Sequence, residues 1–181
     1  DTNAEAECED CVIEATSTAS TNIANTEVDA DAEIEVECDN CVGSSTATAS
    51  IYASGTDEIV TGPITALAES DVAIEDCDDC VVDSTASTTV RASGIDTSIT
   101  GPVDASAISE IEIEDCDNCI VDSAAATTVS VGGIDTSITG PVNATAASGV
   151  EINDDCDDCI LDSTAATTVI EEGIDSSKTG P

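Results

Sequence analysis

A repeat of about 39 residues constrains this chain more than any other feature of its sequence. C-x-x-C pairs recur along the chain, at offsets of 30, 39, 39 and 40 residues. A second marker, T-G-P, recurs at offsets of 39, 39 and 40 residues and ends at Pro63, Pro102, Pro141 and Pro181. The sequences of successive repeats are also nearly identical from one marker to the next, as in CDDCVVDSTASTTVRASGIDTSITGP and CDNCIVDSAAATTVSVGGIDTSITGP. Such a period predicts stacked units that bury their apolar residues against one another.

The markers divide the chain into five units that we expect to form one elongated β-repeat domain. The units are a shorter N-terminal unit (1–37), three full repeats (38–76, 77–115 and 116–155) and a truncated C-terminal unit (156–181). The first unit lacks T-G-P, and we expect it to cap or adapt one end. The chain begins at Asp1 without Met, which we interpret as a processed, exported form. The last T-G-P is in phase with the acidic segment at the N-terminus, so we expect copies to stack head to tail.

Each unit has the pattern of β-strands separated by turns, and we expect almost no helix. AEIEVE (32–37), EIEIED (110–115) and VEIND (150–154) alternate apolar and polar residues, as half-buried strands do. The C-x-x-C that follows has turn residues at its centre, and we expect CIVDS, ATTVSV and IDTSIT to be three further strands. Four strands per unit predict an all-β fold of tandem repeats of about 39 residues, stacked as β-arches with one unit per layer or as a β-solenoid with two rungs per unit. A β-sandwich is a third arrangement.

The composition excludes several classes of function. The chain contains two basic residues, counting Lys and Arg together, and forty acidic ones, which gives a net charge of −38. Neither nucleic acid nor an anionic membrane is therefore an expected partner. No run of 18 apolar residues is present in the sequence, and no membrane span is expected. The chain has no Phe, Trp, Met or His, so a Ser–His–Asp triad is impossible and we expect no enzyme. Stacked carboxylates repel by roughly 1 kcal/mol per pair in water, so a folded form needs counterions, protonation or covalent bonds.

The ten cysteines are predicted to form disulfides. They are Cys8, Cys11, Cys38, Cys41, Cys77, Cys80, Cys116, Cys119, Cys156 and Cys159. Acidic neighbours raise the pKa of a thiol, which argues against a redox C-x-x-C. A zinc or iron–sulfur site needs two pairs, but five pairs leave one over. We favour a bond within each pair and hold open bonds between units or between chains.

The carboxylates beside the cysteine turns predict a weak ladder for hard divalent cations. Its members are Asp76, Asp83, Asp115, Asp122, Asp155 and Asp162. Oxygen-only clusters suit calcium, although no EF-hand pattern is present in the sequence. We therefore expect no required cofactor and consider divalent cations such as calcium as optional ligands; a solvated acidic face is the other interpretation.

Three functions fit this pattern. The first is a self-assembling extracellular structural protein of a cell envelope, sheath, filament or surface layer, with copies of itself and related structural subunits as partners. The second is an acidic repeat adhesin or cation-binding surface module. The third is ice binding, because TATAS (46–50) and the recurring TTV give rows of Thr.

The acidic, cysteine-containing β-repeat is similar in style to the sheath proteins of filamentous methanogenic archaea. The resemblance covers residues 8–181 through the CDNC…TGP repeat. It implies stacked β-arches that form amyloid-like, insoluble hoops around cells, with bound metal ions.

Overall fold

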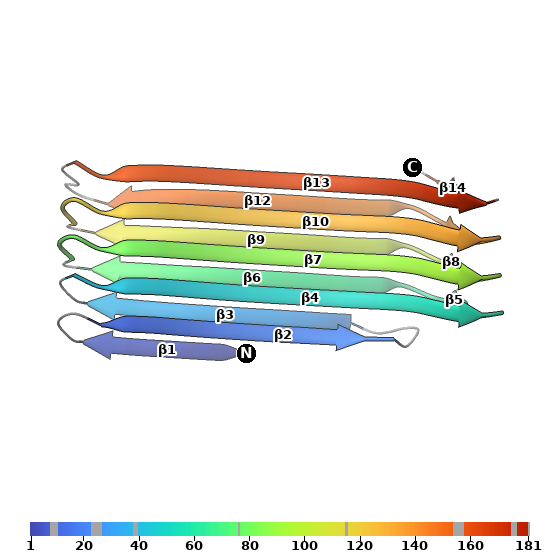
Figure 1. The fold of residues 1–181 in the computed structure, drawn as a ribbon, viewed down its shortest axis with the longest axis horizontal. Helices are drawn as coiled ribbons and strands as arrows, with labels where there is room; N and C mark the ends of the chain where they lie inside the picture. Colours follow the sequence, from blue (N-terminus) through green and yellow to red (C-terminus); the bar gives the residue numbers. More distant parts are fainter. Residues whose placement is uncertain are drawn as a thin grey trace.

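The computed structural model describes residues 1–7, 11–22, 27–37, 40–75, 77–114, 116–153, 158–174 and 177–180. Within these residues every regular element is a β-strand and no helix occurs, which confirms the all-β prediction. Successive strands lie in parallel along the stack and form a β-solenoid (Figure 1).

One repeat makes one rung of the solenoid. We call the rung made of β9, β10 and β11 the central rung. In it, β9 (Val103–Glu114) runs to the cysteine turn and β10 (Ile120–Ile134) returns from it. The short strand β11 (Ser137–Thr139) then closes the narrow side, and Gly140–Pro141 leads into the next rung. The two long strands of a rung belong to different sheets, so each rung is also a β-arch.

The other rungs repeat this plan. Their strands are β1 (Thr2–Glu7), β2 (Val12–Thr21), β3 (Glu27–Glu37), β4 (Val42–Thr56), β5 (Ile59–Thr61), β6 (Ile64–Glu75), β7 (Val81–Ile95), β8 (Ser98–Thr100), β12 (Val142–Asn153), β13 (Ile160–Ile174) and β14 (Ser177–Thr179). We call β1 and β2 the N-terminal rung, and β12, β13 and β14 the C-terminal rung. The first long sheet has the order β1-β3-β6-β9-β12, the second β13-β10-β7-β4-β2, and the short sheet β14-β11-β8-β5. Figure 1 shows the second long sheet in front of the first.

The register decides between the two predicted stacking schemes. Val103 pairs with Val142, and Ile120 pairs with Val81, so residues 39 apart are direct neighbours. The scheme with one unit per layer is therefore confirmed for these repeats, and the two-rung scheme is wrong. Like residues pair with like residues at most positions of these repeats because the strand pairing and the sequence repeat have the same period.

The structure has three strands per repeat where the sequence predicted four. CIVDS from Ile120 onward and all of ATTVSV lie in one continuous strand, β10, which ends at Ile134. Of the rest of IDTSIT, Ser137–Thr139 forms the short strand β11. The segment between them, around Ser123 and Ala124, contains no Gly or Pro that would end a strand. Ser123 is tolerated in the core because its hydroxyl is hydrogen-bonded, so the strand continues through it.

The core is a thin layer between the two long sheets. On β6 and β9 the small side chains lie at the middle of the strand and the branched ones nearer the ends, because the sequence places Ala and Ser between Val and Ile there. In the central rung the buried inward residues are Val103, Ala105, Ala107, Ser109, Ile111 and Ile113 on β9, and Val121, Ser123, Ala125, Thr127, Val129 and Val131 on β10. Stacking covers each of these ladders with its own copies, so small residues suffice to exclude water from the interior.

A chain of serine hydroxyls runs through this core along the stack. Each hydroxyl lies 2.8–3.0 Å from the hydroxyl of a serine on the opposite sheet. In order the chain is Ser45, Ser70, Ser84, Ser109, Ser123, Ser148 and Ser163. Most of these hydroxyls also reach a backbone carbonyl, as Ser109 does with the Ser84 oxygen at 2.8 Å. The serine chain links the two sheets from β4 to β13, and this fixes how they are staggered.

The three rungs from β3 to β11 each turn at two residues with a left-handed backbone, and the described part of the C-terminal rung has one such residue. In the central rung the two residues are Asn118 in the cysteine turn (φ 55°) and Asp135 before β11 (φ 53°). The equivalent residues of other rungs are Asn40, Asp57, Asp79, Asp96 and Asp158. Asn and Asp tolerate this conformation better than other residues with a Cβ, which explains their recurrence at these two positions.

Replacing Asn118 with Val is expected to destabilise the fold by about 1–2 kcal/mol, because a β-branched residue is strained at φ 55°. Asn118→Gly, which has no such strain, is the matched control and should lie within about 0.5 kcal/mol of the native chain. Guanidinium denaturation followed by far-ultraviolet circular dichroism measures both. Equal stability of the Val and Gly variants would contradict the left-handed turn.

Candidate functional site

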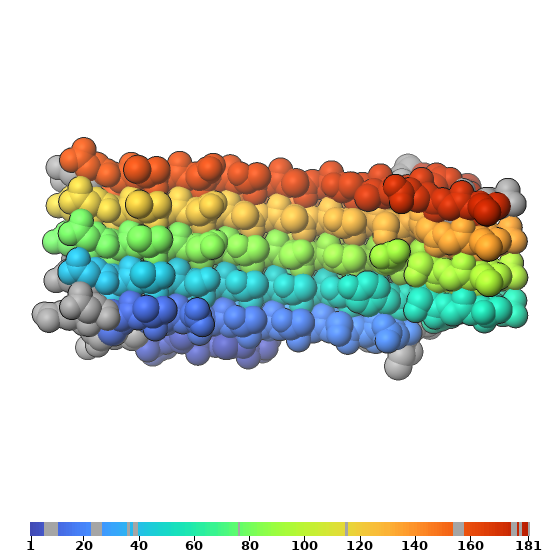
Figure 2. Space-filling view, viewed as in Figure 1, coloured from blue at the N-terminus to red at the C-terminus, as the bar shows by residue number. Residues whose placement is uncertain are grey.

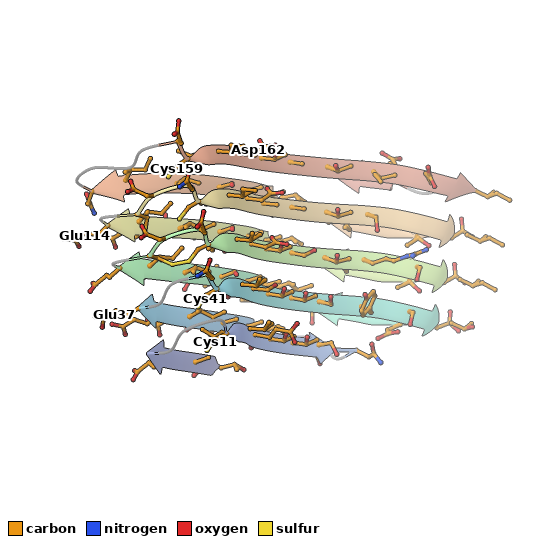
Figure 3. The ribbon with its side chains drawn as sticks, turned by 60° about the vertical axis from the view of Figure 1, so that its left-hand side comes forward. Cys11, Glu37, Cys41, Glu114, Cys159 and Asp162 are labelled. Atoms are coloured by element: carbon orange, nitrogen blue, oxygen red, sulfur yellow. A yellow bond between two sulfur atoms is a disulfide. The ribbon has the colours of Figure 1, made fainter. Side chains whose placement is uncertain are left out.

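The cysteine turns form a column at one end of the rungs. Successive turns are hydrogen-bonded to each other: the Asp79 amide donates to the Asp117 carbonyl at 3.0 Å, and the Ile120 amide donates to the Cys80 carbonyl at 2.8 Å. Figure 3 shows Cys11, Cys41 and Cys159 along this column. The turns are therefore part of the stack and not free loops.

The disulfide prediction is met in part of this column. Cys77 and Cys80 are bonded to each other, with Cα atoms 6.4 Å apart, and both are buried. Cys11, Cys41 and Cys159 also carry disulfides. Their C-x-x-C companions Cys8, Cys38 and Cys156 lie outside the described residues.

Cys116 and Cys119 depart from the predicted pairing, because both are buried free thiols in this structure. Each sulfur also lies near a carbonyl oxygen: Cys116 Sγ is 3.4 Å from the Glu114 oxygen, and Cys119 Sγ is 3.5 Å from the Cys77 oxygen of the neighbouring rung. The equivalent turn of the neighbouring rung has a sulfur–sulfur bond between Cys77 and Cys80.

A hydrogen bond between the two thiols shifts their pKa values in opposite directions. Their mutual hydrogen bond, followed by burial, raises the pKa of Cys116, and the same hydrogen bond lowers the pKa of Cys119 to about 7. The carboxylates of Asp78 and Asp79 raise the pKa of Cys119, as the sequence predicted, but this effect is smaller than that of the hydrogen bond. A thiolate beside a thiol is the arrangement from which an oxidant closes a disulfide.

The described members of the predicted cation ladder lie in one column on the second long sheet. Asp83, Asp122 and Asp162 pair in register on β7, β10 and β13 and are exposed. Asp76, Asp115 and Asp155 lie outside the described residues. In the part of the chain that the structure describes, no group of three or more Cys, Asp or Glu residues is arranged to hold a metal ion.

The outer face of the first long sheet carries an acidic groove that the sequence analysis did not single out. Glu33, Asp71 and Glu110 lie in register on adjacent strands β3, β6 and β9. With the neighbouring column of Glu112 and Glu151 they line an open groove of about 440 Å³. Aligning Asp71 with Glu110 by the 39-residue offset would have found this column.

Asp71 is the most perturbed carboxyl of this groove. It is half-buried, and this burial, followed by repulsion from Glu110 and Glu69, raises its pKa from 3.8 to about 6. Burial and the carboxylates of Asp29 and Asp31 also raise the pKa of Glu69. A cation in this groove would relieve the repulsion.

The raised pKa of Asp71 predicts a fold that becomes less stable as the pH rises. The folded state binds this proton more tightly than the unfolded state, so stability falls between about pH 4 and pH 6 and stays low above that window. Asp71→Asn should therefore stabilise the chain at pH 7, by about 1 kcal/mol after allowing for solvent screening, and by nothing below pH 4.

Urea denaturation at pH 3.5 and pH 7 tests this expectation. The exposed Asp83→Asn variant is the control for the removal of one charge. An Asp71→Asn variant that loses stability at pH 7 would show that the carboxylate is stabilising there.

The C-terminal rung exposes residues that are buried in the inner rungs. Leu161 is 41 % exposed, whereas its neighbour Val121 is 1 % exposed. Val169 is 49 % exposed, whereas Val129 is 1 % exposed. The inward side chains of β13 are therefore of the same kind as those of an inner strand, but no further strand covers them at this end of the core.

The described residues contain no helix with the length and apolar character needed to cross a membrane. Comparisons of the chain with protein-family models, with curated proteins and with solved structures give no match. The cysteine column, the acidic groove and the open edge of the stack are the three features of the molecule that bear on its function.

Proposed function

We propose that the protein is a self-assembling extracellular structural protein, of the sheath, filament or surface-layer kind, in which copies stack end to end. The proposal rests on the exposure of the inward side chains of the C-terminal rung. Its inward residues from Leu161 to Val169 match those of the inner rungs, but they are exposed. A further rung in the same register would cover them as β13 covers β10.

The energy available at such a junction is substantial. Full burial of an aliphatic side chain stabilises by about 1.5–3 kcal/mol, and Ile152, Leu161 and Val169 are each partly exposed at this edge. The unpaired backbone groups of the edge strands would also gain partners. Because every rung has the same register, one contact geometry serves for each added copy, as an open-ended assembly requires.

The disulfides support an oxidising, extracellular location, where such bonds persist. Cys77–Cys80 closes a turn in the middle of the stack, and we expect Cys116 and Cys119 to close in the same way under oxidising conditions. The cysteines of these turns are buried although the residues between them are exposed, and this burial protects the bonds from reductants. Covalent closure also opposes the repulsion among the carboxylates.

A cation-binding surface module is the second candidate, and the acidic groove favours it. The groove brings Glu33, Asp71 and Glu110 together in a column of like charges. Hard divalent cations such as calcium bind oxygen ligands of this type. Calcium would then order a soluble protein without causing it to polymerise.

Sedimentation and electron microscopy of the oxidised 181-residue chain test the two candidates. We expect filaments or sheets that persist in detergent. A monomer that stays soluble at all salt and calcium concentrations would refute the structural proposal. A monomer whose unfolding temperature rises with calcium would favour the cation-binding module.

A further inference from the structure

We propose that two copies of the chain pair through the outer face of the second long sheet, with their strands antiparallel. A two-fold axis that runs along the stack and passes over Ser87 relates the two copies. We call the outward residues from Val81 to Arg91, with their in-register counterparts on β2, β4, β10 and β13, the pairing face. This contact is lateral, and it does not depend on whether copies also stack end to end.

The pairing face carries little charge. β4 has no acidic residue, and β7 and β10 have one each, Asp83 and Asp122. By contrast, β3 in the first long sheet has an acidic residue at every second position from Glu27 to Glu37. The outward residues in the middle of β4, β7 and β10 are Ser, Thr and Ala. Two copies of a chain with a net charge of −38 therefore repel each other less across this face than across the first long sheet.

Pairing also keeps the acidic faces of the two copies apart. Packed sheets lie about 10 Å from each other, so the two first long sheets would be separated by three such spacings, roughly 30 Å. The screening length in physiological salt is about 8 Å. The acidic groove around Asp71 and Glu110 would thus face solvent on both sides of the pair and would not oppose its formation.

The charges on β7 are arranged for a two-fold contact. Its outward residues Asp83, Thr85, Ser87, Thr89 and Arg91 are symmetric in spacing about Ser87, and both charged residues are exposed. Within one copy Asp83 and Arg91 are eight positions apart in the strand, about 26 Å, so they cannot pair with each other. The proposed axis places Arg91 of each copy opposite Asp83 of the other, which forms two ion pairs. With parallel strands, Asp83 would instead face Asp83.

The same axis suits the strands on either side of β7. On β4 it places Tyr52 opposite Ser44, so a large side chain meets a small one. On β10 it places the Ser130 hydroxyl opposite the carboxylate of Asp122, which accepts hydrogen bonds. One geometry therefore gives complementary contacts on three adjacent strands.

The size and shape of the pairing face match a stable interface. Eleven residues along each strand and five strands across give roughly 33 Å by 24 Å, about 800 Å² per copy. A standard protein–protein interface buries about 800 Å² on each partner. Figure 2 shows this face as straight, parallel bands, and even sheets with small side chains pack closely on each other. Val42, Val81 and Ile120, which are 42–49 % exposed along one margin of the face, would lose contact with water.

Photo-crosslinking of the oxidised 181-residue chain tests the pairing and its direction. p-Benzoylphenylalanine is placed at position 130 in a mixture of unlabelled and nitrogen-15-labelled copies, so that mass spectrometry recognises links between copies. We expect links from position 130 to residues 120–126 of another copy. The same group at position 106, on the outer face of β9, should give no link between copies. Links from 130 to the region around 130 of another copy, equal links from both positions, or no links from 130 would overturn the proposal.

A charge exchange gives an independent readout. Arg91→Asp places a carboxylate opposite Asp83 and should lower the yield of links from position 130 by about 10-fold or more. The double variant Asp83→Arg/Arg91→Asp has the composition of the native chain and should restore the yield to within about 2-fold. Circular dichroism checks that both variants fold. A double variant that stays as low as the single one would show that these residues do not face each other.

The outcomes separate this proposal from the proposed function. Links between copies in a chain that forms no filaments would support the pairing and overturn the structural role. Filaments without links from position 130 to residues 120–126 of another copy would overturn the pairing alone.

Discussion

Replacing Gly94 with Ala is expected to destabilise the solenoid by at least about 3 kcal/mol. A Cβ at this position would lie 2.2 Å from the carbonyl oxygen and 2.8 Å from the amide nitrogen of Gly55, its neighbour in the stack. Backbone atoms of a paired strand cannot move aside as a flexible side chain can. The residue also has φ +130°, where an L side chain is strained, so the clash and the strain add.

Gly149→Ala is the matched control for this prediction. A Cβ at Gly149 meets no atom within 4 Å, and its φ is not in the left-handed region. This variant should be neutral or more stable by up to about 1 kcal/mol, because Ala reduces the entropy of the unfolded chain. Chemical denaturation of both variants measures the difference. If Gly94→Ala were as stable as Gly149→Ala, the direct stacking of Gly94 on Gly55 would be wrong.

Replacing Ser109 with Ala should cost about 2 kcal/mol. Its hydroxyl lies 2.8 Å from the Ser84 hydroxyl and 3.0 Å from the Ser123 hydroxyl, at the centre of the buried chain. Removing it breaks the chain into two halves, and each lost hydrogen bond contributes about 1 kcal/mol in a dry core. The loss should appear as a lower unfolding temperature and a lower denaturation midpoint.

Ser163→Ala is the control, since Ser163 ends the same chain on the exposed strand β13. In the unassembled chain its removal should change stability by less than about 0.5 kcal/mol. Equal costs at Ser109 and Ser163 would mean that the chain does not act as a connected, buried unit.

The sequence determined the fold class and the period of the stack. Alternation of apolar and acidic residues in EIEIE, with Thr, Val and Ile elsewhere, predicts strands, and the structure has strands there. The 39-residue repeat predicts that like residues stack, and Asp83, Asp122 and Asp162 do lie in one column. The alternation is a local pattern and the repeat is a periodic one, and both can be recognised in the amino-acid sequence alone.

Only the tertiary structure decided how many rungs a repeat makes and which side chains of neighbouring rungs come into contact. A 39-residue unit has the length for two short rungs or for one long rung, and the choice depends on pairing between β7 and β10, far apart in sequence. The free thiols of Cys116 and Cys119 and the raised pKa of Asp71 also depend on neighbouring rungs. Part of the burial, hydrogen bonding and repulsion at these residues comes from contacts about 40 positions away, such as Cys119 with Cys77 and Asp71 with Glu110, and no local pattern in the sequence specifies those contacts.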